Sequence, residues 1–307
     1  HSNAWGQAAR FFSPPAVPIL HTVCDLDAGA ADAFARRWGW RNAAVDWRAV
    51  VASAEIDLVD IVTPNHLHAP MALAALAAGK HVACEKPLAR TLEEAEAMAA
   101  AAQGKQSFVW FNYRRAPAVA LAHLLVRKGR LGDLRHVRAH YLQDWADESV
   151  PLAWRFDGEL AGSGAHGDLN AHIVDLARFV TGLEVEEIGG AAAATFIAER
   201  ALPAGAAAGG IAAGLKARKA RGKVSVDDAL AFLCRFAGGA LGVFEAARQA
   251  TGHQNDNFLE LNGTKGSLRF AFERMNELDY YDATAERAVQ GWTTIMATHA
   301  GAHPYLE

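Results

Sequence analysis

The sequence predicts two domains: a doubly wound, mainly parallel α/β domain over residues 1–110 and an α+β domain over residues 111–307. Three observations support this prediction. Short apolar strands alternate with helical segments before residue 113, which is the pattern of βαβ units. After it, apolar strands are separated by Gly-containing turns, which favours a large, mostly antiparallel sheet with one open face. A chain of 307 residues is also long for a single hydrophobic core.

The first domain is expected to contain four strands joined by helices. The strands are expected at residues 18–24, 58–62, 81–84 and 107–111, and the helices at 28–39 and 70–78, with a third from residue 91. Asp27 precedes the first helix as an N-cap. Thr91 is followed by Glu94 three residues later, which is the capping-box pattern of a helix start.

The second domain is expected to begin with a helix at 117–128, a long strand at 133–144 and a helix at 165–181. Two hairpins are predicted to follow, pairing 223–235 with 240–248 and 258–261 with 267–272, because Gly-containing turns separate the apolar runs. Residues 203–223 are rich in Ala and Gly and then basic. We expect a mobile surface loop there, with a lid or a subunit contact as alternatives.

Composition narrows the class of protein. The net charge is −4, with 51% hydrophobic and 21% charged residues, as in ordinary globular proteins. This balance gives no reason to expect a nucleic acid or an anionic membrane as partner. No apolar run reaches membrane-spanning length, and no signal peptide is visible. The three cysteines are far apart, which argues against a disulfide framework and a zinc site and favours a cytoplasmic protein without a metal.

Lys86 is the first candidate for chemistry. It follows the strand at 81–84 between Glu85 and Pro87, and open α/β sheets bind their ligands at the carboxyl ends of parallel strands. Taken alone, the segment is equally compatible with a surface lysine in a turn. Thr63, Pro64, Asn65 and His68 follow the preceding strand and are expected at the same edge of the sheet. Asn65 and His68 are candidates for contact with a cofactor or substrate, although Asn65 also suits a helix cap.

Asp168, His172 and Asp175 are spaced i, i+4 and i+7, which places them on one face of a helix. A histidine there can accept a proton near neutral pH, while a neighbouring carboxylate orients its ring. A core histidine satisfied by an aspartate, or a helix with solvated charges, is the alternative.

Two further sets of residues suggest ligands. Asp25 ends the strand at 18–24, where an acidic residue of a dinucleotide-binding fold accepts from the ribose and favours NAD over NADP; a turn aspartate is the alternative. No Gly-rich phosphate loop precedes that strand. Gln143, Trp154 and Arg155 belong to segments that combine aromatic faces with polar groups. Such a mixture suits a sugar ring, and it is equally common in structural loops.

Four motifs resemble the glucose–fructose oxidoreductase/inositol dehydrogenase (Gfo/Idh/MocA) family. They are TPNHLH at 63–68, EKPLA at 85–89, FNYRR at 111–115 and GDLNAHIVDLARF at 167–179. The resemblance implies a Rossmann domain, an open-sheet second domain, NAD as cofactor with NADP as an alternative, and a homo-oligomer, either a dimer or a tetramer. It also implies that a first strand and a Gly-rich loop precede His1 in relatives, and that relatives continue past the AHPY segment at 302–305.

The resemblance further implies roles for individual residues. Lys86 stabilises negative charge on the reacting oxygen, His172 is the general base, and Asp168 binds an adjacent hydroxyl. The cofactor contacts are Asp25, Thr63, Pro64, Asn65, His68, Glu85 and Lys86. The substrate contacts are Tyr113, Gln143, Trp154, Arg155 and, from the sheet, Arg248.

The leading hypothesis is therefore an oxidoreductase that transfers hydride from a secondary hydroxyl of a sugar, anhydrosugar or cyclitol to NAD(P). A glycosidase on the same fold, working by transient oxidation and elimination, is an alternative. A non-catalytic sugar or nucleotide sensor is another, although a sensor is expected to lose Lys86 or His172, and both are present.

Overall fold

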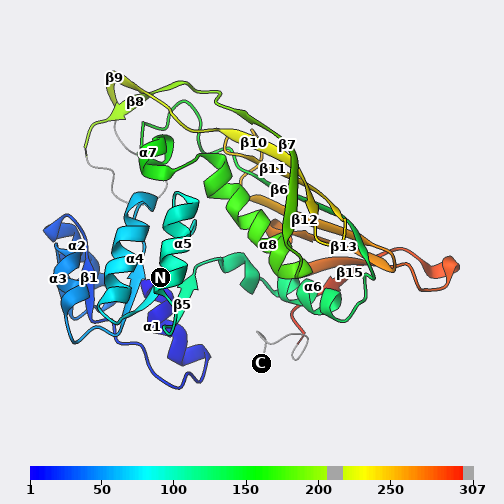
Figure 1. The fold of residues 1–307 in the computed structure, drawn as a ribbon, viewed down its shortest axis with the longest axis horizontal. Coiled ribbons are helices and arrows are strands. Elements are labelled where there is room, and N and C mark those ends of the chain that lie inside the picture. The colour runs from blue at the N-terminus through cyan, green and yellow to red at the C-terminus, as the bar shows by residue number, and fades with distance from the viewer. Residues whose placement is uncertain (206–216, 300–307) are drawn as a thin grey trace. The chain divides into compact units, whose positions relative to one another are not determined.

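The computed structural model describes residues 1–205 and 217–299. The chain divides into two compact units, which are considered separately (Figure 1). Unit 1 comprises His1–Thr63 and Leu67–Val109, and unit 2 comprises Pro64–His66 and the residues from Trp110 onward.

Unit 1 is built on parallel strands. They are β1 (Thr22–Cys24), β2 (Asn42–Ala44), β3 (Leu58–Ile61), β4 (His81–Cys84) and β5 (Ser107–Val109). β1 pairs with β2, while β3, β4 and β5 form a second sheet in that order. Every pairing is parallel, so the predicted α/β class is confirmed. The short, half-exposed β2 was not predicted, because three residues carry too little periodicity to be recognised.

The helices of unit 1 are α1 (Ser2–Phe11), α2 (Ala28–Trp38), α3 (Trp47–Ala52), α4 (His68–Ala77) and α5 (Leu92–Ala101). The predicted caps are confirmed: the Asp27 carboxylate accepts from Ala30 N at 2.7 Å, and Thr91 Oγ1 accepts from Glu94 N at 3.2 Å. α4 begins at His68, two residues earlier than expected, because Pro70 is tolerated in a first turn whose N–H groups lack helical partners. α4 packs on β3 and β4, and Ala72, Ala75 and Val82 are buried in this core.

Unit 2 contains an eight-stranded sheet in the order β15-β14-β13-β12-β6-β11-β10-β7. The strands are β6 (Leu134–Leu142), β7 (Val185–Ala194), β10 (Ala229–Phe236), β11 (Leu241–Ala247), β12 (Asp256–Gly263), β13 (Gly266–Ala271), β14 (Glu277–Asp282) and β15 (Trp292–Met296). All pairings except β6–β11 are antiparallel. Both predicted hairpins are confirmed, and Gly238 and Gly239 supply positive φ angles of 83° and 89° in the first turn.

Helices cover one face of this sheet. The helices are α6 (Pro117–Arg127), α7 (Gly158–Ala161) and α8 (Ala171–Thr181), with a π-helical turn at His166–Asn170 and 3₁₀ turns at Asn65–Leu67, Asn112–Arg115, Trp154–Phe156, Phe272–Arg274 and Arg287–Val289. α8 contacts β6 and β12, and α6 contacts β13 and β14 (Figure 1). Ile173 and Leu176 of α8 are fully buried against Phe244 and Leu259 of the sheet. Leu233, Leu241 and Val243 point to the other face and are exposed, which confirms the expected open face.

The prediction of a loop at 203–223 is wrong in its C-terminal part, which forms a strand. β9 (Ala217–Lys223) pairs antiparallel with β8 (Glu199–Pro203); residues 206–216 of that prediction lie outside the described part of the chain. The strand was missed because its side chains are mostly basic and exposed, so no apolar alternation marks it. Gly222 leaves room for the Leu152 side chain, since a Cβ at position 222 would lie 2.6 Å from it.

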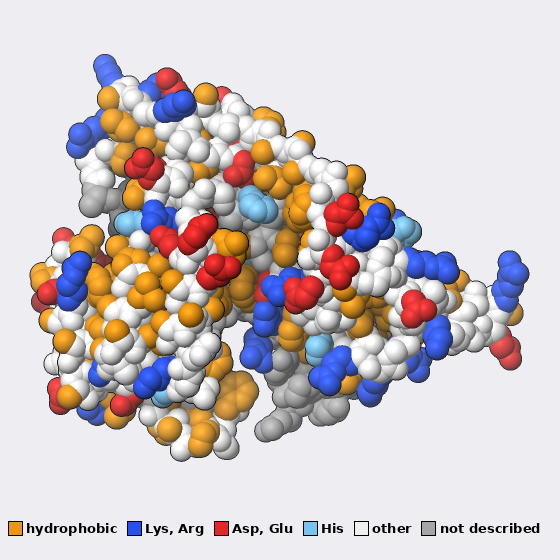
Figure 2. Space-filling view, in the orientation of Figure 1, with side chains coloured by type: hydrophobic (Ala, Val, Ile, Leu, Met, Phe, Trp, Pro, Cys, Tyr) orange, Lys and Arg blue, Asp and Glu red, His pale blue; other side chains and the backbone are white. Residues whose placement is uncertain are grey.

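The distribution of charged side chains and the character of the helices agree with the composition. Acidic and basic side chains are interspersed over the face shown in Figure 2. Within residues 1–205 and 217–299, no helix combines the length and the apolar character needed to cross a membrane.

Candidate functional site

β4 delivers Glu85 and Lys86 to the carboxyl edge of the unit 1 sheet. Val82, Ala83 and Cys84 are buried, and Glu85 N closes the ladder by donating to Ile61 O at 2.9 Å. The Glu85 carboxylate then accepts from Lys86 N at 2.9 Å, and the Lys86–Pro87 peptide is cis. These contacts fix the backbone that carries Lys86 at the edge where open α/β sheets bind ligands.

His1 lies between two carboxylates beside this turn. Its Nδ1 is 2.9 Å from Asp60 Oδ2 and its Nε2 is 2.9 Å from Glu85 Oε1, while Trp5 Nε1 donates to Asp60 at 2.8 Å. Hydrogen bonds to Asp60 and Glu85 outweigh burial and raise the pKa of His1 to about 9. The protonated ring therefore joins β3 to the Glu85–Lys86 turn at neutral pH. Sequence reasoning missed this contact, although Asp60 inside an apolar strand signals a paired carboxylate.

Two of the residues that follow β3 form hydrogen bonds with backbone carbonyl groups. The imidazole of His68 is fully buried, and its nitrogens lie 2.9 Å from Pro87 O and 2.9 Å from Thr63 O. His68 thus joins the turns that follow β3 and β4. Asn65 is also buried and donates to Ala161 O at 2.8 Å, so its amide does not cap α4.

Asp25 stands exposed at the carboxyl end of β1. Its N–H donates to Ala44 O at 3.1 Å, and its carboxylate accepts from Asp27 N at 3.0 Å. An exposed carboxylate in this position suits the hydroxyls of a ribose.

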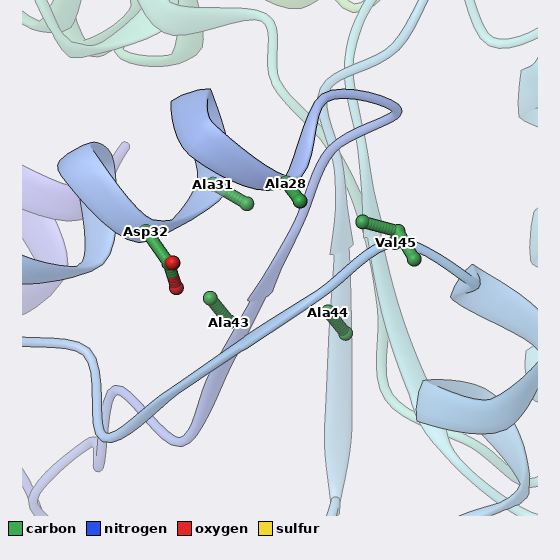
Figure 3. A pocket seen from close by; sticks show the side chains of 6 residues that line it. All are labelled: Ala28, Ala31, Asp32, Ala43, Ala44 and Val45. Atoms are coloured by element: carbon green, nitrogen blue, oxygen red, sulfur yellow. The ribbon is translucent and has the colours of Figure 1, made fainter.

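A pocket of about 180 Å³ also lies between α2 and β2 (Figure 3). It is lined by Ala28, Ala31, Asp32, Ala43, Ala44 and Val45. None of the predicted site residues lines it.

In unit 2, His172 is surrounded by aromatic rings. The residue is 8% exposed, and the centroid of its ring lies 4.7 Å from that of Tyr113, 5.8 Å from that of Tyr141 and 6.2 Å from that of Phe111. Asp175 does not serve this ring in the way the helical spacing suggested: its carboxylate forms a two-pronged ion pair with Arg114. That pair fixes the 3₁₀ turn carrying Tyr113 against α8.

The predicted helix at 165–181 is confirmed, but Asp168 lies in a π-helical turn at its start rather than in regular α-helix. The turn is imposed from outside the helix, because the Asp227 carboxylate accepts from Gly164 N and His166 N. A Cβ on Gly164 would lie 1.7 Å from Asp227 O. Burial is the main cause of the raised pKa of both Tyr113 and Tyr141, and the negative charge of Asp168 adds to it. Such π turns occur frequently at functional sites.

A hydrogen-bonded set of side chains adjoins His172. The Tyr113 and Tyr141 hydroxyls contact each other, and Tyr141 Oη donates to Asn255 Oδ1 at 2.6 Å. Gln143 Nε2 donates to both Tyr141 and Asn255, at 3.1 and 2.9 Å, and Gln143 Oε1 accepts from Trp145 Nε1 at 2.8 Å. Asn255 was not predicted, since a single amide in a polar loop gives no signal in one sequence.

Trp154, Arg155 and Arg248 form a second group. The Arg155 guanidinium lies 4.3 Å from the Trp154 ring centroid. Arg248 is fully buried and donates to Arg155 O at 3.2 Å and Asp227 O at 3.0 Å. Burial lowers its pKa. Arg248 therefore supports the backbone of two loops rather than an exposed surface.

Comparison with known proteins places the chain in a family. Residues 1–113 match an oxidoreductase family with an NAD-binding Rossmann fold, and residues 119–269 match the GFO/IDH/MocA C-terminal domain. Levoglucosan dehydrogenase of Pseudarthrobacter phenanthrenivorans is 44% identical over 312 residues, which cover 100% of this chain and 78% of that protein. The chain belongs to the Gfo/Idh/MocA family.

Other relatives agree with this assignment. 1,5-Anhydro-D-fructose reductase of Ensifer adhaerens is 31% identical over 85% of this chain and 69% of that protein. An oxidoreductase domain protein from Kribbella flavida superimposes with a TM-score of 0.91 at 50% identity, covering 100% of this chain and 78% of that one. A levoglucosan dehydrogenase in complex with NADH and L-sorbose superimposes with a TM-score of 0.90 at 41% identity, covering 99% of this chain and 78% of that one. The predicted family, fold class, NAD cofactor and dehydrogenase class are confirmed, and this family member is an NAD-dependent oxidoreductase.

Proposed function

We propose that the protein oxidises a secondary hydroxyl of a sugar or anhydrosugar. The observation that carries the proposal is His172: a nearly buried imidazole ringed by Phe111, Tyr113 and Tyr141, with Asp168 one turn before it. A base held in apolar surroundings beside hydroxyl-binding groups suits removal of a proton from an alcohol. The names of the relatives, a levoglucosan dehydrogenase and an anhydrofructose reductase, support an anhydrosugar.

The turns that follow β1, β3 and β4 supply the cofactor side of this proposal. Bound NAD⁺ provides the hydride acceptor. Asp25 accepts from the adenosine ribose and favours NAD over NADP. Thr63, Pro64 and Glu85 stand in the turns after β3 and β4, while Asn65 and His68, being buried, contribute by fixing those turns.

The chemical steps are divided among three side chains. Lys86 donates a hydrogen bond to the reacting oxygen and stabilises its developing negative charge. The imidazole of His172 takes the hydroxyl proton as the carbon loses hydride. Asp168 accepts from a neighbouring hydroxyl and favours the protonated form of the imidazole after transfer.

We assign recognition of the substrate's shape to the aromatic and polar side chains of unit 2. Tyr113 and Gln143 belong to the hydrogen-bonded set beside His172, and Trp154 with Arg155 offers a stacked apolar face and a cation. Arg248 does not contact the substrate in this proposal; it positions the Arg155 backbone by donating to its carbonyl oxygen. We also expect a cytoplasmic homo-oligomer, because Cys24, Cys84 and Cys234 are free thiols and because Leu233, Leu241 and Val243 are exposed on the open sheet face.

NADH formation by the full-length protein tests the proposal. The panel contains levoglucosan, myo-inositol, glucose, galactose and xylose, at alkaline pH, with NAD and NADP in parallel. Turnover of a sugar with NAD is the expected result. Glycoside cleavage without net NADH points to the glycosidase, cofactor binding without turnover or cleavage points to a sensor, and turnover restricted to myo-inositol replaces the sugar with a cyclitol.

A further inference from the structure

Five side chains of unit 2 form one hydrogen-bonded series, here called the tyrosine relay: Trp145, Gln143, Asn255, Tyr141 and Tyr113. Trp145 Nε1 carries a hydrogen and has no acceptor function. Because it donates to Gln143 at 2.8 Å, the atom it meets must be the amide oxygen. The orientation of the Gln143 amide is thereby fixed, and its NH₂ group points to Tyr141 and Asn255.

The same reasoning fixes Asn255 and Tyr141. The Gln143 NH₂ group lies 2.9 Å from Asn255, so the atom there must be the carbonyl oxygen, which only accepts. Tyr141 Oη lies 2.6 Å from that oxygen and must use its single hydrogen on it. Its lone pairs then face the remaining neighbours, the Gln143 amide and the Tyr113 hydroxyl.

Tyr113 is therefore left with one arrangement. Its hydrogen goes to Tyr141, since Tyr141 has none to give back. Burial raises the pKa of both phenols, so both hydroxyls keep their protons in the neutral range. Tyr113 has lone pairs left on its oxygen and no hydrogen left to offer.

We infer that the tyrosine relay makes Tyr113 an obligatory hydrogen-bond acceptor beside His172, so that it selects substrates presenting a hydroxyl donor there. The ring centroids of Tyr113 and His172 are 4.7 Å apart. This inference rests on the proposed sugar substrate, and it assigns Trp145 and Asn255 as positioning residues. An analogue with fluorine or an ether oxygen in place of that hydroxyl leaves Tyr113 facing another acceptor.

Neutron diffraction from deuterated crystals of the full-length protein tests the arrangement without any substrate. We expect the deuterium of Tyr113 between the two phenol oxygens and that of Tyr141 directed at Asn255. Deuterium of Tyr141 directed at Tyr113 overturns the inference, whatever the enzyme acts on.

Kinetics test the consequence. Wild type is assayed with the best sugar of the panel and its set of mono-deoxyfluoro analogues. One analogue is expected to lose about tenfold to a hundredfold in kcat/KM through the unpaired acceptor. Asn255→Leu removes the acceptor of the Tyr141 hydrogen, so the loss in kcat/KM for that analogue should shrink to severalfold or less. Asn255→Asp keeps an acceptor at this position, so the loss should be the same as in the wild type.

Tyr281→Phe is the matched control, because its hydroxyl donates to Gln290 in another part of unit 2; the loss should be unchanged. An equal loss in wild type and in Asn255→Leu overturns the inference, as does the absence of any sensitive position. Failure of every sugar in the panel counts against the proposed function alone, since the neutron result stands apart from it.

Discussion

The reacting groups proposed here are two side chains held by very different means. Lys86 depends on a short turn fixed by Glu85, His1 and His68, whereas His172 sits in an aromatic environment on a long helix. Replacing either with alanine removes a proton acceptor or a charge-stabilising group, so kcat should fall by about a hundredfold or more. NAD affinity, followed by protein fluorescence, should change little.

Lys105→Ala is the matched control for Lys86→Ala, because Lys105 binds the backbone of Gly79 on the exterior of unit 1. It should retain wild-type kcat. Near-normal turnover in both Lys86→Ala and His172→Ala contradicts the assigned roles.

His1 predicts a pH dependence of stability. Its pKa is about 9 in the folded protein, against an ordinary value of 6.5 for a histidine side chain, so the folded state binds the proton more tightly than the unfolded chain does. The stabilisation is fully present below about pH 6.5 and is lost as the pH rises through about 9. The difference in Tm between the wild-type protein and His1→Ala, measured across this range, should be largest at the acid end and vanish above pH 9. A difference that grows with pH contradicts the protonated bridge.

Single residues were predictable where their position has a general meaning. Lys86 follows a parallel strand and His172 lies on a helix face, so spacing marked both as candidates, and the family resemblance supplied their roles. The partners were not predictable. Asp175 was expected beside His172 but binds Arg114, and Asn255 comes from a loop more than a hundred residues after Tyr141, because such pairs form only when the sheet brings distant segments together.

At the scale of elements, the π-helical turn before α8 controls the position of Asp168. Gly164 is packed against Asp227 O, where a Cβ would lie at 1.7 Å. Gly164→Ala should cost about 1–3 kcal/mol or more of unfolding free energy through overpacking and should lower kcat through displacement of Asp168. Urea unfolding and steady-state kinetics measure the two effects.

Gly190→Ala is the control, because a Cβ there has open space on β7; stability should change by less than about 1 kcal/mol. Equal behaviour of the two variants argues against a strained packing at Gly164.

Elements were predictable when their periodicity was long or their turns distinctive. α2, α6 and both hairpins followed from caps, apolar spacing and paired glycines. The π turn did not, because it is imposed by the Asp227 carboxylate on backbone N–H groups. β9 did not either, because its exposed basic residues resemble a loop and its pairing with β8 lies outside local sequence.

For the whole molecule, we expect the open face of the unit 2 sheet to form the subunit contact of the proposed oligomer. Leu241 and Val243 of β11 are 43% and 38% exposed, and burial of such side chains favours association. We expect Leu241→Glu with Val243→Glu to lower the molar mass measured by light scattering, with little change in the folded subunit. An unchanged mass places the subunit contact elsewhere.

The family and the fold class were accessible from the sequence because separate motifs occur in order along the chain. Substrate identity was not, since one or two pocket side chains redirect specificity within one fold.

Transfer of deuterium from substrate to cofactor tests hydride transfer directly. The sugar with the highest turnover in the panel is prepared with deuterium on every carbon and incubated with the full-length protein and NAD⁺. We expect the NADH formed to carry one deuterium on the nicotinamide ring, delivered from the carbon whose hydroxyl loses its proton. Consumption of the sugar with unlabelled NADH, or without any NADH, would contradict hydride transfer from the sugar.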